Sequence, residues 1–342
     1  MKTDDYPVDI VIPWVDSSDP DWRRERDSFL NRTETDVAMD ASEARFRDGG
    51  TLKYVLRGID RYMPWVRTVH FVTWGHLPEW LDKDAEGLHI VNHRDYIPHA
   101  YLPTFSSHTI ELNMHRIPGL AEHFIYFNDD MLPLRPLQRQ DFFINGLPAD
   151  FAVETSLTGR YVHSLAGVML SNASVINQNF SKRKVMREHF GKWFHYRYGI
   201  NQFKTLLLLV WPRFADFSNN HTANPYLKTT FSRVWEKENE LLDTVCRHRF
   251  RQMDDVNQWL MRDWQLISGK FVPKSTNTAK VFVIADDLSE IQRALDEKKY
   301  QIICINDVSY EKIADFKETT EKIRIMLETV LPGESRFERT DV

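Results

Sequence analysis

The sequence predicts an α/β fold, in which helices flank a mostly parallel β-sheet and a helical insertion interrupts the chain. Short runs of apolar, often β-branched residues alternate with segments whose apolar residues recur at helical spacing. A stretch dense in basic and aromatic residues separates two such parts of the chain. These two patterns together indicate a sheet core and an inserted helical region.

The first part of the chain supplies four expected strands and two expected helices. The strands are apolar runs that lead into polar loops: residues 8–15, 68–73, 88–91 and 123–127. The helices show apolar residues at helical spacing: residues 52–59 and 110–117. Strands that alternate with helices usually pair in parallel, and their ligands bind beyond the carboxyl ends of the strands. Functional residues are therefore expected in loops that follow strands.

The α/β pattern returns near the C-terminus. Residues 281–285 and 301–305 are expected to be strands, followed by helices through Leu295 and Met326 respectively. The resulting organisation is an α/β core and one insertion: residues 1–145 with 274–342, and residues 146–273.

The composition is that of an ordered globular protein, with 342 residues of which 42% are hydrophobic and 27% charged. A net charge of −5 gives no reason to expect binding to nucleic acid. Cys246 and Cys304 are too few for a disulfide framework or a cysteine-based zinc site, so both are expected to be inert packing residues.

No export or membrane-spanning signal is visible in the sequence. The first residues, MKTDDYPVDIVIPWVD, lack the basic, apolar and small-residue regions of a signal peptide. The longest aliphatic run, residues 206–211, is far shorter than the roughly 20 residues that a spanning helix requires. We therefore expect a cytoplasmic protein.

The strongest local motif is HFIYFNDDM, in which an expected strand leads directly into Asn128, Asp129 and Asp130. Adjacent carboxylates at the carboxyl edge of a sheet can bind Mg²⁺ or Mn²⁺, which neutralises a diphosphate, and nucleotide-sugar transferases use such acidic pairs. Asn and Asp are also common in turns and helix caps. From this motif alone both interpretations stay open. The expected α/β fold is nucleotide-sugar-transferase-like.

A second acidic loop, Asp16 to Asp19, follows the first expected strand. Asp19 precedes Pro20, an arrangement typical of a helix N-cap followed by proline at the first helical position. We therefore expect a structural role for Asp19 and keep Asp16 as a residue that could face a ligand.

Four separated blocks and a terminal motif follow one another in a characteristic order. They are IVIPWVDSSDP, FRDGGTLKYVLRGIDRYMPWVRTVHFVTWGHLPEWL continuing through LPTFSSHTIELNMHRIPGLAEHFIYFNDD, NNHTANPYLK, HRFRQMDDVNQWLMRDWQLISGKF and LPGESRFE. The chain resembles the Stealth family, whose bacterial members make phosphodiester-linked capsular or exopolysaccharides and whose animal relative is N-acetylglucosamine-1-phosphotransferase.

The resemblance implies transfer of a hexose 1-phosphate, here expected to be an N-acetylhexosamine 1-phosphate, from a nucleotide diphosphate sugar to a polysaccharide hydroxyl. A phosphodiester forms and a nucleoside monophosphate leaves. The family favours UDP-N-acetylglucosamine as donor and Mg²⁺ or Mn²⁺ as cofactor, and the polysaccharide acceptor could be carried on a lipid.

The resemblance also implies roles for individual residues. Four fall on the family's catalytic positions: Glu111, Asp130, His221 and Arg251. Asp129 lies beside Asp130 at the implied metal site, and four more residues are candidates for substrate binding: Asp16, Arg47, Asp48 and Asp255. His221 and Arg251 lie in the 146–273 insertion. The family usually has Gly where Ser17 stands, so the fit of the donor near Asp16 is an open point.

The chemistry of phosphoryl transfer suits these residue types. A histidine with a pKa near roughly 6.5 can accept the proton of the acceptor hydroxyl, so His221 is the expected base, with a carboxylate as the alternative. Arg251 and a metal can cover the charge of the phosphoryl oxygens, and Arg47 could add to that cover. The alternative for Arg47 and Asp48 is a surface ion pair with a helix cap.

Two histidines flank Glu111 at spacings that could suggest metal ligands. His115 lies one helical turn beyond Glu111, and His108 precedes it. Packing on a helix face is the favoured interpretation for both. Asp255 follows Arg251 at helical distance, which also fits an intrahelical partner for the guanidinium.

Two other function classes remain to be distinguished. A conventional metal-dependent glycosyltransferase would use the same donor but release a nucleoside diphosphate. A polysaccharide-binding module would use the abundant aromatic residues and consume no nucleotide.

The basic and aromatic stretch at residues 181–213 carries eight Lys or Arg residues and one acid, Glu188. It could be a solvated helical insertion. It could equally lie on the anionic inner face of the membrane, which would make the protein peripheral there.

Overall fold

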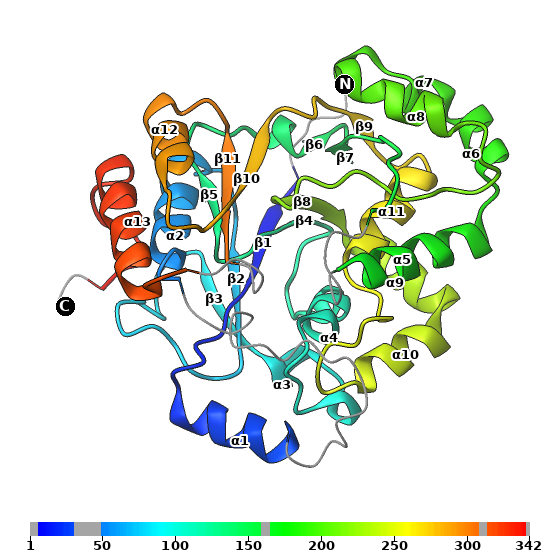
Figure 1. Cartoon of the computed structure of the whole chain (residues 1–342). Helices are drawn as coiled ribbons and strands as arrows, with labels where there is room; N and C mark the ends of the chain where they lie inside the picture. Colours follow the sequence, from blue (N-terminus) through cyan, green and yellow to red (C-terminus); the bar gives the residue numbers. More distant parts are fainter. Residues whose placement is uncertain (1–5, 31–48, 159–164, 308–312, 340–342) are drawn as a thin grey trace.

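The computed structural model describes residues 6–30, 49–158, 165–307 and 313–339 (Figure 1). A five-stranded sheet in the order β3-β2-β1-β4-β8 crosses the molecule. Its strands are β1 (Val8–Pro13), β2 (Val69–Thr73), β3 (Leu88–Asn92), β4 (His123–Tyr126) and β8 (Asn224–Leu227). The first four are parallel and only β8 is antiparallel to its neighbour. The expected α/β fold with a mostly parallel sheet is confirmed.

The two faces of this sheet bury two separate cores. Val8, Ile10 and Ile12 of β1 point into one core, whereas Val11 points into the other, as the two-residue period of a strand requires. Because both faces are buried, the strands are continuous apolar runs. This explains why they could be recognised in the sequence.

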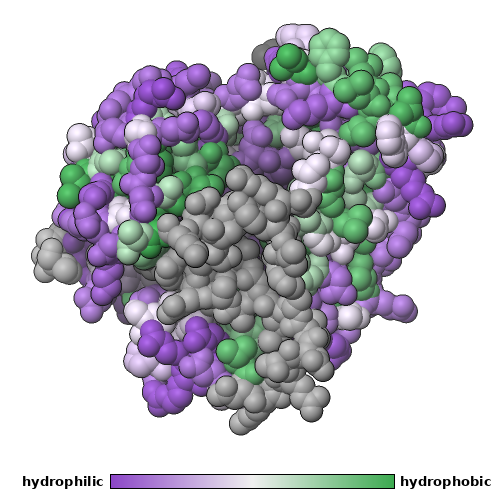
Figure 2. Space-filling view, in the orientation of Figure 1, coloured by the Kyte–Doolittle hydropathy of each residue, from purple (hydrophilic) through white to green (hydrophobic). Residues whose placement is uncertain are grey.

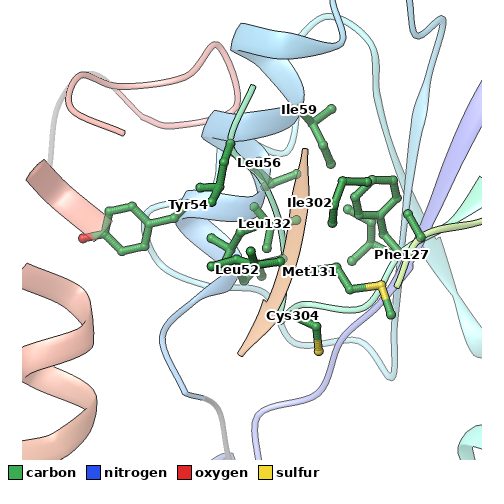
Figure 3. Close-up of a cluster of buried hydrophobic side chains, with 14 of the residues drawn as sticks. Leu52, Tyr54, Leu56, Ile59, Phe127, Met131, Leu132, Ile302 and Cys304 are labelled. Atoms are coloured by element: carbon green, nitrogen blue, oxygen red, sulfur yellow. The ribbon is translucent and has the colours of Figure 1, made fainter. Parts of the chain in front are cut away.

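The first core is closed by a second, three-stranded sheet in the order β10-β11-β5. Its strands are β5 (Met131–Pro133), β10 (Ala279–Val283) and β11 (Ile302–Asn306). The helices packed in this half are α2 (Leu52–Tyr62), α12 (Ser289–Glu297) and α13 (Phe316–Val330). Leu52 and Leu56 of α2 lie close to Leu132 and Ile302, with Cys304 at the edge of the cluster (Figure 3).

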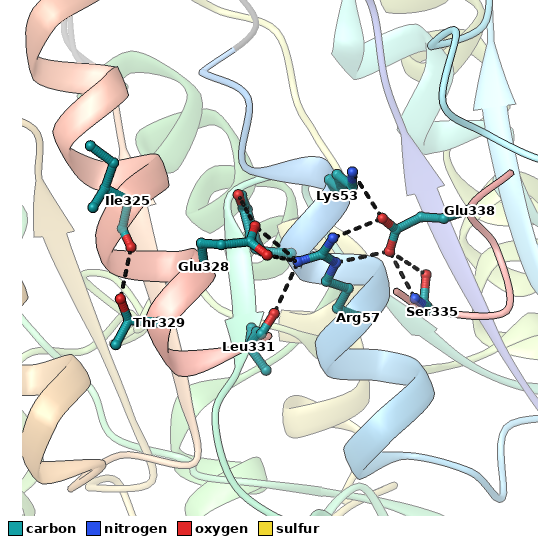
Figure 4. A network of polar contacts seen from close by, with 9 residues as sticks. Lys53, Arg57, Ile325, Glu328, Thr329, Leu331, Ser335 and Glu338 are labelled. Carbon is teal, nitrogen blue, oxygen red and sulfur yellow. Dashed lines mark hydrogen bonds and ion pairs between the residues drawn. The ribbon is translucent and has the colours of Figure 1, made fainter. Parts of the chain in front are cut away.

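An ion network centred on buried Arg57 and Glu338 ties α2 to the C-terminal segment (Figure 4). Arg57 Nε and Nη2 donate to the two carboxylate oxygens of Glu338, both at 2.9 Å. Arg57 Nη1 donates to Glu328 at 2.9 Å and to the Leu331 carbonyl at 3.1 Å. Each donor group of the guanidinium therefore has a partner, and the terminal motif is held against the core.

The second core lies under helices that come mostly from residues 146–273. They are α5 (Ala166–Asn179), α6 (Lys182–Glu188), α7 (Phe190–Trp193), α8 (Gln202–Leu208), α9 (Lys228–Lys237), α10 (Asn239–Arg247) and α11 (Trp259–Ile267). A 3-10 helix, η5 (Tyr196–Asn201), joins α7 to α8, so the helical character expected for residues 181–213 is confirmed. None of the helices in the described residues has an apolar stretch long enough to span a bilayer.

A small third sheet lies where the expected core and insertion meet. Its strands, in the order β6-β7-β9, are β6 (Phe143–Ile144), β7 (Leu147–Asp150) and β9 (Val272–Pro273). The strand β8 comes from the 146–273 segment and pairs with β4 of the main sheet. The division into core and insertion stays a prediction about organisation.

The single helix expected at residues 110–117 is divided into two shorter elements in the structure. Helix α4 covers Ser107–Leu112, and a separate 3-10 turn, η3, covers Met114–Arg116. Asn113 Nδ2 donates to the Thr109 carbonyl at 2.8 Å, so the side chain takes an acceptor that helical backbone would use. Two further short helices, α1 (Pro20–Leu30) and α3 (His93–Tyr96), follow β1 and β3.

Candidate active site

A cavity of about 230 Å³ opens at the carboxyl ends of β1, β4 and β11. This is the edge at which parallel sheets bind ligands. Four of the predicted catalytic residues line it: Glu111, Asp130, His221 and Arg251. Asp129 lines it too, so these five residues bring three separated sequence blocks to one cavity.

One carboxylate oxygen of Asp130 accepts a hydrogen bond, and the other has no partner among the described residues. Cys304 Sγ donates to Asp130 Oδ2 at 3.2 Å, while Oδ1 is buried and has no hydrogen-bond partner among the described residues. The backbone is fixed as well, because Ile305 N–H donates to the Asp130 carbonyl at 3.0 Å and Thr51 Oγ1 donates to the Asp129 carbonyl at 2.7 Å. The acidic pair is therefore a fixed feature of the cavity wall.

Burial raises the pKa of Asp130 above its ordinary value, although the nearby His221 and the Cys304 hydrogen bond act in the opposite direction. A carboxylate oxygen that is buried without a partner favours the arrival of a cation or a donor.

His221 reaches the same point from the loop before β8. Its backbone has a positive φ of 44°, and its N–H donates to Asn219 Oδ1 at 2.8 Å. Its ring meets Trp259 edge-on, with centroids 5.7 Å apart. The antiparallel pairing of Tyr126 with Asn224 brings the loop before β8 beside the end of β4.

The described residues fit a divalent cation at this position. Potential ligand atoms of Asp130, His221 and Cys304 lie within 4.8 Å of one another. This set offers an oxygen, a nitrogen and a sulfur donor, and Asp129 lines the same cavity.

Glu111 and Arg251 are brought together by α4. Ser107 and Glu111 are four residues apart and share one face of this helix. Arg251 Nη2 donates to Ser107 Oγ at 2.6 Å, and Tyr126 O–H donates to Glu111 Oε1 at 3.1 Å. Glu111 Oε2 is buried without a partner in the described residues, as is Asp130 Oδ1. Burial and the neighbouring Glu111 raise the pKa of Tyr126 well above its ordinary value, so its hydroxyl stays a donor.

Asp255 lies behind the cavity wall and is buried. Its carboxylate accepts hydrogen bonds from His108 Nδ1 at 3.0 Å and His248 Nδ1 at 2.7 Å. Burial alone would raise the pKa of Asp255, but the bonds from His108 and His248 lower it. The structure thus gives Asp255 the position of a residue that orients His108, which does line the cavity.

Asp16 is not among the residues that line the cavity, although its neighbours Trp14 and Val15 are. Its carboxylate accepts from Ser18 N–H at 2.7 Å and from Ser18 Oγ at 2.6 Å. Asp19 caps α1 by accepting from the Trp22 N–H at 2.8 Å, which confirms its predicted structural role. Arg47 and Asp48 lie outside the described residues.

His115 packs against aromatic side chains, as the sequence predicts, and does not form a ligand set with Glu111. Its ring stacks on Phe231 at 5.8 Å and contacts Trp235 at 6.2 Å. Burial lowers the pKa of His115 to about 3, so it is neutral. His108 is fixed by Asp255.

The contact between Cys304 and Asp130 could not be foreseen from the sequence. Both cysteines are buried, as expected for packing residues, and the Cys304 thiol also donates to Asp130 Oδ2. Tyr126 and Ser107 were missed as well, although Tyr126 lies three residues before Asp129 and Ser107 four residues before Glu111. Proximity to a strand end was the signal that could have found Tyr126.

Comparison with known proteins agrees with the resemblance of the sequence blocks to the Stealth family. The family description Stealth protein CR1, conserved region 1, matches residues 6–34, and Stealth protein CR2, conserved region 2, matches residues 45–149. The chain is 38% identical to a capsular polysaccharide phosphotransferase WcwK of Streptococcus pneumoniae, over 97% of this chain and 98% of that protein.

Other relatives are similar over their whole length. The exopolysaccharide phosphotransferase cps2G of Lactiplantibacillus plantarum is 35% identical over 98% of this chain and 97% of its own. The receptor polysaccharide phosphotransferase WefC of Streptococcus gordonii is 35% identical over 97% and 98%. Among solved structures, the apo-form glycosyltransferase GlyE of Streptococcus pneumoniae TIGR4 aligns at 10% identity over 95% of this chain and 83% of its own, but with a TM-score of only 0.22, which carries no weight. The chain therefore belongs to the Stealth family and is a phosphotransferase of that family.

Proposed function

We propose that this protein transfers a hexose 1-phosphate from a nucleotide diphosphate sugar to a hydroxyl of a capsular or exopolysaccharide. The acceptor oxygen attacks the phosphorus that carries the sugar, a phosphodiester forms, and the nucleoside monophosphate leaves with the bridging oxygen. The proposed donor is UDP-N-acetylglucosamine, and the acceptor could be carried on a lipid.

One observation carries the proposal. Glu111, Asp130, His221 and Arg251 come from distant parts of the sequence and line a single cavity at the carboxyl edge of the sheet. The named relatives act on capsular polysaccharide and exopolysaccharide, which supports the same class of acceptor here.

Asp129 and Asp130 are the residues that would hold Mg²⁺ or Mn²⁺. When bound, such an ion supplies positive charge that offsets the diphosphate and the departing monophosphate. Cys304 orients the Asp130 carboxylate by its hydrogen bond to Oδ2 and leaves Oδ1 for the cavity.

Arg251 is proposed to cover the phosphoryl oxygens. Its bond to Ser107 fixes the guanidinium against α4, so the planar donor group needs little reorganisation when a phosphate arrives. Glu111 has one oxygen held by Tyr126 and a second oxygen without a partner in the described residues, so it can accept a proton or a substrate hydroxyl.

His221 is the proposed general base, because its ring lines the cavity near Asp130 and an imidazole accepts protons near neutral pH. Glu111 is the alternative base. A comparison of His221→Ala with Glu111→Gln distinguishes them. The variant that lacks the base loses the fall of kcat on the acidic side of the pH profile, whereas the other variant keeps it.

The reaction class is tested by the released nucleotide. The protein is incubated with a panel of nucleotide sugars, an acceptor polysaccharide and Mg²⁺ or Mn²⁺, and the nucleotide product is identified by chromatography. UMP is the expected product with the UDP-sugar donor. Release of UDP would instead identify a conventional glycosyltransferase, and absence of any nucleotide release across the panel would favour a polysaccharide-binding role.

A further inference from the structure

Exposed large apolar side chains are concentrated in one part of the molecule. In the described residues there are eleven of them, and nine lie between Phe190 and Trp211. We call these nine the apolar face: Phe190, Tyr196, Ile200, Phe203, Leu206, Leu207, Leu209, Val210 and Trp211. Figure 2 shows a concentration of hydrophobic surface at the upper right, where Figure 1 places α7 and α8. Solvent-exposed patches of this kind usually mark a contact surface.

The apolar face is exposed because the backbone beneath it is anchored by buried polar bonds. Lys182 is 3% exposed, and its Nζ donates to Glu154 at 2.8 Å and to the Leu208 carbonyl at 2.6 Å. Lys192 Nζ donates to the Phe271 carbonyl at 2.8 Å. Two lysines of this region therefore point inward, while nine large apolar side chains of the same region point outward.

Exposed basic side chains share this stretch of the chain with the apolar face. Between residues 181 and 213, six Lys or Arg side chains are exposed: Arg183, Lys184, Arg187, Arg197, Lys204 and Arg213. Glu188 is the one exposed acid of this stretch, and it lies 4.0 Å from Lys184. The chain as a whole carries a net charge of −5, so this region is positive against a negative protein.

We propose that the apolar face docks on an anionic lipid bilayer, with its aromatic and leucine side chains in the headgroup region and its basic side chains on the lipid phosphates. The combination of apolar area with basic side chains in one stretch of the chain matches that boundary. The negative remainder of the protein would be repelled, which orients the docked molecule. Since no described helix can span the membrane, the contact would be peripheral, at its inner face for a cytoplasmic enzyme.

A second copy of the chain fits this face less well than a bilayer does. A two-fold contact would place the same basic side chains of both copies opposite one another, and like charges at an interface cost affinity. An anionic surface instead neutralises all six of them.

The test is flotation of the full chain with vesicles of phosphatidylcholine, with or without phosphatidylglycerol, at low salt. Wild-type protein is expected to float with the anionic vesicles. The triple variant Phe203→Ser, Leu207→Ser, Val210→Ser should lose about 1000-fold in partitioning, since each of the three buried apolar side chains contributes about ten-fold. Leu170→Ser with Ile325→Ser, the two exposed apolar residues outside the face, is the matched control and should bind as wild type.

A second variant separates the electrostatic contribution. Arg183→Gln, Lys184→Gln, Arg187→Gln should lower partitioning to anionic vesicles by about 100-fold, because each basic residue near the surface contributes about five-fold. Binding to neutral vesicles should not change. All six substituted residues are exposed, so folding, and nucleotide release with a water-soluble acceptor, should match wild type.

Three outcomes would overturn the proposal. The wild-type protein could stay unbound on anionic vesicles at low salt, or the apolar triple variant could bind them as well as wild type does. Light scattering could also show that this variant converts a dimer into a monomer with vesicle binding unchanged, which would identify a self-association face. None of these results depends on phosphotransfer, so the proposed function is tested separately.

Discussion

Two parts of the molecule bury charged groups in opposite ways. In the network of Arg57, Glu328 and Glu338, every guanidinium nitrogen and every carboxylate oxygen has a partner. In the cavity, Asp130 Oδ1 and Glu111 Oε2 are buried without a partner among the described residues. The first arrangement stabilises the folded chain, whereas the second leaves acceptors for a ligand.

The difference gives a criterion for assigning roles to buried charges. A satisfied network loses stability when one member is removed, because its partner is left unpaired. An unsatisfied carboxylate can be neutralised with little effect on folding, but its ligand then lacks a contact. Variants in the two regions should therefore change different measured quantities.

The largest expected effect is that of Asp130→Asn on turnover. Loss of the carboxylate charge at the proposed metal position should lower kcat by about 10³-fold, since one charge-stabilising group is worth several kcal/mol in the transition state. The melting temperature should stay close to that of wild type, because the buried Oδ1 has no partner to lose. Initial rates of UMP release and calorimetry measure both quantities. Asp84→Asn, an exposed substitution, is the control, and wild-type turnover by folded Asp130→Asn would contradict the assignment.

Arg57→Met should have the next largest effect, this time on stability. The substitution removes both Arg57 bonds to buried Glu338, which keeps only Lys53 at 3.0 Å and the Ser335 donors. Breaking a buried pair costs about 3–5 kcal/mol, and the remaining partners place this variant at the lower end. Urea unfolding measures the free energy, and the variant's kcat at low temperature should be near that of wild type.

Arg61→Met lies on the same helix but is exposed, and it should cost less than about 0.5 kcal/mol. Equal losses in the two variants would show that the network contributes nothing specific.

A smaller effect is expected from acid on the same network. Burial would raise the pKa of Glu338, but hydrogen bonds from Arg57 and Ser335 lower it to about 2. A depressed pKa contributes stability that is present above the ordinary value of 4.5 and is lost as the pH falls toward 2. The contribution is on the order of 2–3 kcal/mol.

Urea unfolding of wild type and Glu338→Gln between neutral pH and pH 3 measures this loss. Their difference in unfolding free energy should shrink steadily below the ordinary pKa of a glutamate. A constant difference would mean that the pKa of Glu338 is the same in the folded and the unfolded state.

The smallest expected effect concerns Cys304. Removing its hydrogen bond to Asp130 Oδ2 by Cys304→Ala should lower kcat about ten-fold, because a misplaced charged acceptor costs about 1–2 kcal/mol. Cys304→Ser keeps a donor and should retain most of the activity. If Ala and Ser variants turn over equally, the thiol only fills space.

The sequence predicted the fold well because the strands of the main sheet are buried on both faces and therefore appear as continuous apolar runs. It also indicated the acidic pair, since Asp129 and Asp130 follow β4 directly. The role of Cys304 could not be predicted, because its thiol meets Asp130 only through the pairing of Cys304 with Met131 across β11 and β5. The direction of the Asp255 side chain likewise depends on His108 and His248, from different elements.

The active site forms only when the antiparallel strand β8 pairs with β4 during folding. Asp130 follows β4 and His221 precedes β8, so the two residues meet only after strands far apart in the sequence have paired. Closing such a long loop is slow compared with forming a helix. During refolding, helical signal should therefore return before catalytic competence. A nascent chain whose β8 has not been synthesised would carry the acidic pair without its imidazole, and would be inert toward the donor.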